Sequence, residues 1–236
     1  MPVEMNAARN VFARVFDALL PRRCALCAAR AERGFCGDCR QMLPWITRAC
    51  EICGAELPAG APGVCGGCQA EEPPSYDRAV IPFRYCEPVA GQIRLLKYRD
   101  QLGHAAALGA MLSLHARRAR PPHPDALMPV PLHGKRLRLR GFNQAMEIAK
   151  SVGRELGIEV RHRELRRIKN TVPQVGLSHA ARRSNVRGAF RASPLRGMHI
   201  ALVDDVVTSG STVDAAARAL KRAGAETVSV WAVARA

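Results

Sequence analysis

Two adjacent carboxylates followed by a small hydroxyl-rich turn form the most chemically informative stretch of this sequence. Asp204 and Asp205 follow the apolar run 200–203, and after two valines comes Thr208-Ser209-Gly210-Ser211-Thr212. Such a turn at the start of a helix binds phosphate through hydroxyls and backbone N–H groups, and a glycine lets the phosphate approach. Paired acids at the end of a parallel strand lie within reach of sugar hydroxyls. The alternative, a core strand with an N-capped helix, needs only one acid.

Four Cys-x-x-Cys pairs between residues 24 and 68 predict metal sites. Each pair presents two thiolates, and two pairs complete the four-sulfur shell of structural Zn²⁺. We expect two structural zinc ions and a segment that depends on metal to fold. Sequential pairing is favoured because Pro44 and Trp45 separate the two sets; interleaved pairing would give a cross-brace. The expected ligands are Cys24, Cys27, Cys36, Cys39, Cys50, Cys53, Cys65 and Cys68.

The positive charge of the chain lies in its C-terminal part. The net charge is +16, from 36 basic and 20 acidic residues, yet residues 1–75 hold eight of each. Within residues 133–191, 15 basic residues face four acidic ones. A concentrated, arginine-rich segment suits a polyanion such as nucleic acid, or pyrophosphate at closer range. The alternative is an ordinary basic surface.

Alternating strand and helix patterns predict an α/β fold with a mainly parallel, doubly wound sheet. Residues 133–144 and 166–174 are too polar and basic for core and are expected to be loops. Strands are expected at residues 77–84, 126–132, 158–165, 200–203 and 226–233, and helices at 8–20, 87–98, 102–118, 143–156 and 213–223. We expect an N-terminal amphipathic helix (1–20), a double zinc ribbon (21–72) with its own core, and an α/β domain (76–236).

Composition excludes some classes of protein. An apolar run of about 18 residues, as a membrane helix needs, is absent. Charged residues interrupt the only candidate signal peptide, so we expect a cytoplasmic protein with reduced cysteines and no membrane partner.

Taken together, these motifs resemble the ComF family, which joins a double zinc ribbon to a type I phosphoribosyltransferase domain. Besides the eight cysteines and the 203–212 stretch, the resemblance rests on Arg140-Gly-Phe-Asn-Gln144 and on Thr171-x-x-Gln174-x-x-Leu177, leading to Arg182, Asn185 and Phe190. Members are tied to natural transformation, where they help process single-stranded DNA. The resemblance implies phosphoribosyl pyrophosphate (PRPP) and single-stranded DNA as partners, with competence-machinery proteins and a role in nucleotide metabolism as further expectations.

The resemblance also implies residue roles. Asp204 and Asp205 would hold the ribose hydroxyls as catalytic groups, Thr208, Ser209, Gly210, Ser211 and Thr212 would bind the 5′-phosphate, and Mg²⁺ would accompany PRPP. For the leaving pyrophosphate the candidate cations are Lys97, Arg138 and Arg140, and for nucleic acid they are Arg136, Arg138, Arg182 and Arg183.

One departure bears on the reaction. The 6-oxopurine phosphoribosyltransferases carry an acid at the position of Thr208, which argues against purine salvage, whereas orotate-type enzymes lack it too. Two hypotheses follow: an enzyme that transfers phosphoribosyl from PRPP to an unidentified acceptor, or a non-catalytic nucleic-acid-binding or adaptor protein that uses the PRPP site for sensing.

Overall fold

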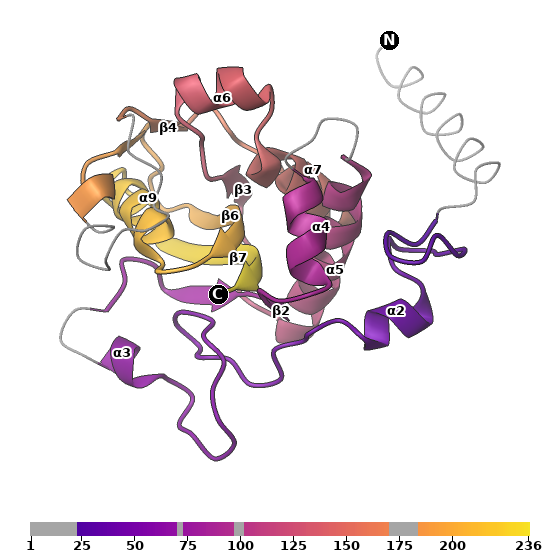
Figure 1. Cartoon of the computed structure of the whole chain (residues 1–236). Helices are drawn as coiled ribbons and strands as arrows, with labels where there is room; N and C mark the ends of the chain where they lie inside the picture. The colour runs from indigo at the N-terminus through magenta and orange to yellow at the C-terminus, as the bar shows by residue number, and fades with distance from the viewer. Residues whose placement is uncertain (1–22, 70–72, 97–101, 170–183) are drawn as a thin grey trace, which may run out of the picture.

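A parallel sheet between two layers of helices forms the body of the protein (Figure 1). The computed structural model describes residues 23–69, 73–96, 102–169 and 184–236. The strand order is β1-β7-β6-β3, with β2 pairing beyond β1 along β7, and every pair in this sheet is parallel. Strands β4 and β5 form a separate antiparallel pair beside this sheet.

The main elements follow the expected alternation of strand and helix. Strands are β1 (Arg78–Val80), β2 (Phe83–Arg84), β3 (Ala126–Pro129), β4 (Leu165–Arg167), β5 (Phe190–Ala192), β6 (His199–Val207) and β7 (Thr227–Arg235). Helices are α2 (Gly37–Gln41), α3 (Gly66–Gln69), α4 (Val89–Leu95), α5 (Gly103–Ala119), α6 (Gly134–Arg140), α7 (Gln144–Leu156) and α9 (Ser211–Arg222).

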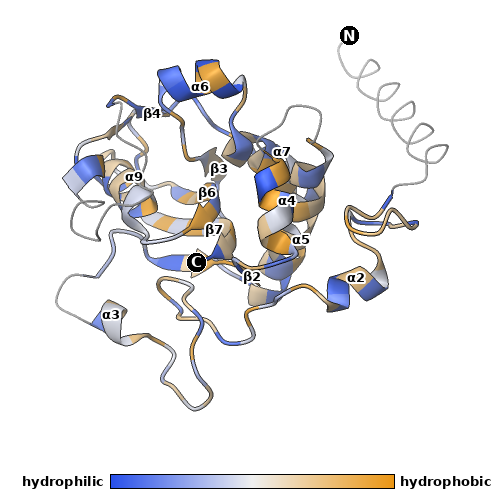
Figure 2. Cartoon of the chain, viewed as in Figure 1, coloured by the Kyte–Doolittle hydropathy of each residue, from blue (hydrophilic) through white to orange (hydrophobic). Residues whose placement is uncertain are grey.

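Each face of the sheet is covered by helices with an apolar side. Helices α4, α5 and α7 cover one face, and α9 covers the other (Figure 1). The central strands β6 and β7 are mostly buried and rich in Val and Ala, as is typical of strands that are covered on both faces. The hydrophobic colouring of the sheet and of the inner helix sides in Figure 2 follows this core.

Three local expectations from the sequence are wrong. Residues 134–140 form helix α6 rather than a loop, because His133 caps it: the N–H of Lys135 donates to His133 Nδ1, and Gly141 ends it with φ 79°. The expected strand at 158–165 is reduced to a bridge between Val160 and Leu127, and strand structure begins at Leu165 and includes Arg167 of the expected second loop. The acids lie within β6, which continues to Val207 instead of ending at Val203.

The cysteine-rich segment does not have a core of its own. Buried Cys24, Phe35 and Leu43 belong to the same hydrophobic cluster as Phe83 and Leu108 of the sheet domain. The rings of Trp45 and Phe83 lie 4.6 Å apart. Separate cores were expected because the segment is poor in apolar residues, but such a segment gains most burial by packing on its neighbour.

Several expectations concern residues outside the described part of the chain. These are the N-terminal helix, Lys97, Arg182 and Arg183, together with Thr171, Gln174 and Leu177. Among the described helices, none combines the length and the apolar character that a membrane crossing requires.

Candidate functional site

The carboxyl end of β6 opens into a pocket formed almost entirely by one continuous stretch of chain. Its lining consists of Asp204 and residues 206–213, and it encloses about 300 Å³ of empty space that is open to solvent. Strand, turn and helix α9 follow one another directly, so the backbone places the acids and the hydroxyls around the same cavity. Such crevices at the strand ends are the usual ligand sites of parallel sheets.

The two carboxylates differ in their surroundings. The N–H of Asp205 donates to Asp204 Oδ1 over 2.9 Å, and the N–H of Val206 donates to Asp205 Oδ1 over 2.8 Å. Burial raises the pKa of Asp204 well above its usual range, and the neighbouring charge of Asp205 raises it further. Ligand hydroxyl groups that donate hydrogen bonds to Asp204 would favour its charged form.

The turn after β6 is shaped by a glycine and an arginine. Gly210 has φ 77°, in the left-handed region that side chains disfavour, and it directly precedes α9. The hydroxyl oxygens of Ser209 and Ser211 lie 3.0 Å apart. From β7, the guanidinium of Arg235 donates to the carbonyl oxygens of Val207 and Thr208. The beginning of the turn is therefore held from the neighbouring strand, and the hydroxyl-bearing residues of the turn line the pocket.

Arg167, which the sequence motifs do not single out, interacts with the charge of Asp204. Arg167 ends β4, and its guanidinium carbon lies 5.3 Å from the ring centre of Phe190 on β5. Burial lowers the pKa of Arg167, the positive charge of Arg136 lowers it further, and the charge of Asp204 opposes both. The charge of Arg167 on β4 therefore interacts both with that of Arg136 on α6 and with that of Asp204. The sequence placed Arg167 in a basic loop, and only the β4–β5 pairing distinguishes it from its neighbours.

The predicted cations of α6 divide into two environments. Arg140 is directed toward the next helix, because its guanidinium donates to the side-chain oxygen of the buried Gln144 at the start of α7. Asn143 caps α7, and its side chain donates to the carbonyl of Val130 over 3.0 Å, so this motif fixes α7 against β3. Arg138 is exposed, and so is Leu139, at 89% of its surface. Figure 2 shows α6 as a largely hydrophilic helix with a hydrophobic turn.

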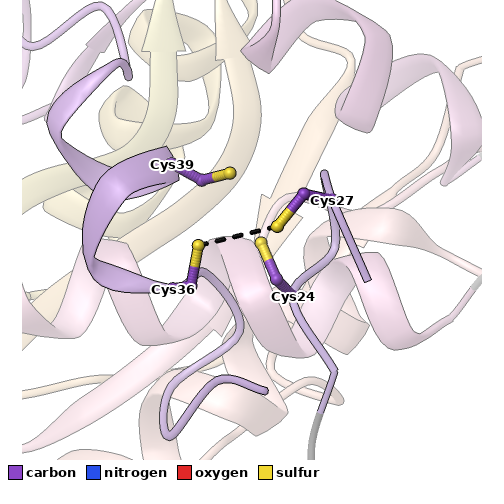
Figure 3. Close-up of side chains that lie close together, drawn as sticks. All are labelled: Cys24, Cys27, Cys36 and Cys39. Carbon is purple, nitrogen blue, oxygen red and sulfur yellow. Dashed lines mark hydrogen bonds between the residues drawn. The ribbon is translucent and has the colours of Figure 1, made fainter. Parts of the chain in front are cut away.

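The eight cysteines form two clusters of four. Cys24, Cys27, Cys36 and Cys39 make one cluster, with their sulfur atoms within 4.8 Å of one another, and their side chains converge in Figure 3. Cys50, Cys53, Cys65 and Cys68 make the other. The sequential pairing favoured from the sequence is confirmed. We call residues 23–41 the first ribbon and residues 49–69 the second ribbon.

Both clusters fit a tetrahedral zinc ion. Sulfur atoms of one pair face those of the other at 3.6 Å, between Cys27 and Cys36 and between Cys53 and Cys65. Zinc–sulfur bonds of about 2.3 Å place tetrahedral sulfurs at a similar spacing. Burial raises the pKa of Cys24, but N–H groups of Cys27, Cys36 and Leu26 outweigh it and lower the pKa to about 6. Cys50 shows the same balance, with a pKa of about 7. The pKa of Cys39 is instead raised by its hydrogen bonds to Cys27 and Cys36, and burial raises that of Cys68. Binding of a metal ion would therefore be needed to ionise all four thiols of a cluster.

Comparison with known proteins matches both parts of the chain. Residues 15–69 match the double zinc ribbon domain, and residues 140–236 match the phosphoribosyl transferase domain. The chain is 35% identical to competence protein F of Haemophilus influenzae, over 91% of this chain and 97% of that protein. It belongs to the ComF family.

Other ComF relatives carry two kinds of name. The DNA utilization protein YhgH of Salmonella typhi is 37% identical, over 92% of this chain and 98% of that protein. The competence protein ComFC of Bacillus subtilis is 28% identical, over 85% of this chain and 83% of that protein. The match to the phosphoribosyl transferase domain extends to residue 236 and includes the whole pocket, from Asp204 to Val213.

The structure brings together most of the predicted pocket residues of this ComF protein. Asp204 and the five residues 208–212 line one cavity, and Asp205 is adjacent in β6. Of the predicted cations on α6, Arg136 interacts with the charge of Arg167, whereas Arg140 donates to Gln144. Two further arginines reach this region from other strands: Arg167 of β4 interacts with the charge of Asp204, and Arg235 of β7 donates to the carbonyls at the start of the turn.

Proposed function

We propose that the pocket binds PRPP with Mg²⁺. The observation that carries this proposal is the continuous lining of one cavity by Asp204 and residues 206–213, with acids at one end and a hydroxyl-rich turn at the start of a helix. The turn and the N-terminus of α9 suit the 5′-phosphate. The acids suit the ribose hydroxyls, which donate to carboxylates.

The geometry supports transfer of the phosphoribosyl group to an acceptor. The bond from C1 of the ribose to the pyrophosphate oxygen breaks, pyrophosphate leaves with the bonding electrons, and an acceptor nucleophile forms the new bond to C1. Asp204 and Asp205 favour the positive charge that develops on the ribose, and Arg167 with Arg136 attracts the leaving pyrophosphate. Mg²⁺ bound with PRPP neutralises pyrophosphate charge. The phosphate turn holds the remote end of the substrate and so positions C1.

We place this chemistry in the processing of single-stranded DNA during DNA uptake, in the cytoplasm. Support comes from relatives named competence protein F and DNA utilization protein. The basic residues of α6 and β4 suit a phosphate backbone. Eight zinc-binding thiols suit a reducing compartment.

The decisive experiment measures pyrophosphate release from PRPP and Mg²⁺ by the full chain. Single-stranded DNA and a panel of nucleobases are added in turn as acceptors, and PRPP binding is followed in parallel by calorimetry. The matched variant is Asp204→Asn with Asp205→Asn, which keeps the shape but removes both charges. We expect this variant to lose PRPP affinity by roughly 10-fold or more, since hydrogen bonds to charged groups contribute about 1.5–3 kcal/mol each.

The outcomes separate the hypotheses. Acceptor-dependent release identifies the enzyme and its acceptor class. PRPP binding without release for any acceptor favours a sensor or adaptor that binds nucleic acid, and the exposed basic helix α6 is the feature consistent with that role. Equal PRPP affinity in the wild type and the folded double variant contradicts the proposed site.

A further inference from the structure

The two ribbons pack against different parts of the sheet domain. The first ribbon contacts α5: a Cβ built on Gly34 would lie 2.4 Å from the Cα of Ala107, so the tip of this ribbon touches the helix backbone. The second ribbon contacts β1 instead. A Cβ built on Gly54 would lie 2.8 Å from Ile81, and the N–H of Ala79 points to the carbonyl of Glu51 at 3.4 Å. Figure 1 shows α2 and α3 on separate sides of the sheet accordingly.

The second ribbon shares its hydrophobic cluster with the phosphate turn. Ile52 and Ala49 of this ribbon pack on the cluster that contains Tyr76 and Ile81. The same cluster contains Val207 and Val213, the residues that flank the turn on either side. The buried residues of the first ribbon belong to the other cluster, beneath α4, α5 and α7. Within the described residues, only the second ribbon is therefore continuous in packing with both ends of the turn.

A short segment between the second ribbon and β1 is hydrogen-bonded to the helix of the site. Ser75 and Tyr76, which we call the strap, lie between the second ribbon and β1. The N–H of Ser75 donates to Asp214 Oδ1 over 2.6 Å, and Arg218 donates to both Asp214 and the hydroxyl of Ser75. Asp214 in turn donates its own N–H to the carbonyl of Gly210. The strap is thus bonded to the first turn of α9.

Tyr76 belongs to the hydrophobic cluster that flanks the phosphate turn. Its side chain is 5% exposed, and its hydroxyl lies 3.7 Å from the position of a Cβ built on Gly210. Burial raises the pKa of Tyr76, and the charges of Cys53, Arg235 and Asp214 also act on its hydroxyl. Tyr76 thus belongs to the hydrophobic cluster on which Ile52 of the second ribbon packs, and its hydroxyl lies close to Gly210 of the phosphate turn.

We propose that the second zinc ribbon, acting through the strap and Tyr76, holds the phosphate turn in its binding conformation, whereas the first ribbon does not. The two zinc sites then have different roles. Loss of metal from the second site disorders residues 208–214 and lowers the affinity for PRPP, whereas loss of metal from the first site does not. The affinity part of this inference rests on the proposed function. The ordering of the turn is a property of the ligand-free protein and stands separately.

The experiment compares matched cysteine variants of the full chain. Cys53→Ser with Cys68→Ser removes the second zinc site, and Cys27→Ser with Cys39→Ser removes the first. The two variants are matched because each replaces the second cysteine of both Cys-x-x-Cys pairs in its site. Metal analysis establishes that each variant keeps one zinc. Amide hydrogen exchange of residues 204–214 is measured without ligand, and PRPP binding with Mg²⁺ is measured by calorimetry.

We expect faster exchange at residues 208–214 only in the variant that lacks the second site. Its PRPP affinity should fall about tenfold or more, which corresponds to the loss of one or two ordering interactions. The first-site variant should stay within about twofold of the wild type, since its contacts do not extend to the turn. Equal effects of the two variants on the turn, or no effect of either, overturn the proposal.

A second set of variants guards against unfolding of the cysteine variants and keeps both zinc sites. Tyr76→Ala removes the packing on the turn and Asp214→Ala removes the acceptor of the strap; both should speed exchange at residues 208–214 with two zincs retained. Tyr76→Phe keeps the ring and should leave exchange near wild type. Wild-type exchange in Tyr76→Ala and Asp214→Ala contradicts the proposal. A wild type that binds no PRPP contradicts the proposed function alone, because the exchange comparison still decides the coupling.

Discussion

The carboxyl group of Asp204 is buried beside Asp205, so its negative charge is unfavourable in the protein without ligand. Its pKa is raised by burial and by Asp205, so the folded state keeps a proton that the unfolded state has released. Below about pH 3.9, the ordinary pKa of aspartate, both states are protonated. As pH rises from there to the raised pKa of the folded state, this group lowers the free energy of unfolding.

We therefore predict that Asp204→Asn is more thermally stable than the wild type at neutral pH. The difference in Tm should shrink toward zero as pH falls to about 4, because the wild-type carboxyl is then neutral in both states. Thermal unfolding of both proteins across the pH range measures this. Asp125→Asn is not a suitable control because Asp125 accepts from the backbone of β6, whereas exposed Asp38→Asn is suitable. A Tm difference that stays constant with pH contradicts the prediction.

Arg167 provides a second test at the scale of single residues. Arg167→Met should weaken binding of PRPP and of pyrophosphate by roughly 10-fold to 100-fold, the range for removal of one charge-assisted hydrogen bond. Its neighbour Arg166 is exposed and lies on the opposite face of β4, so Arg166→Met should stay near wild type. Calorimetry with both ligands gives the comparison, and equal losses in the two variants would show a general charge effect instead.

Helix α6 is the element that we expect to bind nucleic acid. Arg136→Ala with Arg138→Ala should weaken binding of single-stranded DNA of any sequence and flatten its salt dependence, by about 0.7 log units per log unit of salt for each phosphate that is no longer neutralised. The control changes two exposed arginines of the first ribbon, Arg30→Ala with Arg33→Ala. Fluorescence titrations at several salt concentrations measure the slopes. A larger decrease in the ribbon variant would assign DNA binding to the ribbon.

The elements differ in how well their sequence predicted them. The buried part of β6, the turn after it and α9 were predictable, because a β-branched run, a hydroxyl-rich turn and an amphipathic helix are local signals. The end of the strand was not, since β6 continues through the acids to Val207. Helix α6 was not, since Arg and Leu alternate there and the deciding contacts are the His133 cap and Gly141. Arg167 could not be separated from Arg166 without the β4–β5 pairing. The cysteine pairing was favoured from spacing, but the packing of the ribbons on the sheet depends on tertiary contacts such as Trp45 with Phe83.

The molecule as a whole should respond to loss of zinc. We predict two zinc ions per chain by metal analysis. Removing them with a strong chelator should lower the Tm of the sheet domain as well as unfold the ribbons, because Phe35 and Leu43 share a cluster with Phe83 and Leu108. Differential scanning calorimetry before and after chelation tests this, with re-addition of zinc as the control. An unchanged sheet transition contradicts the shared core.

Strand β7 lies between β1 and β6 although β1 precedes it by about 150 residues along the chain, and this has a consequence for synthesis. The cysteine knuckles close short loops and can take up metal while the rest of the chain is still being made. Strand β1 can pair only after the last strand, β7, has been synthesised. Until then the apolar surfaces that the ribbons cover remain incomplete. Chains that stop before residue 227 should therefore have ribbons that bind zinc but a sheet that lacks β7. We expect such chains to aggregate, because exposed apolar surfaces and unpaired strand edges promote aggregation.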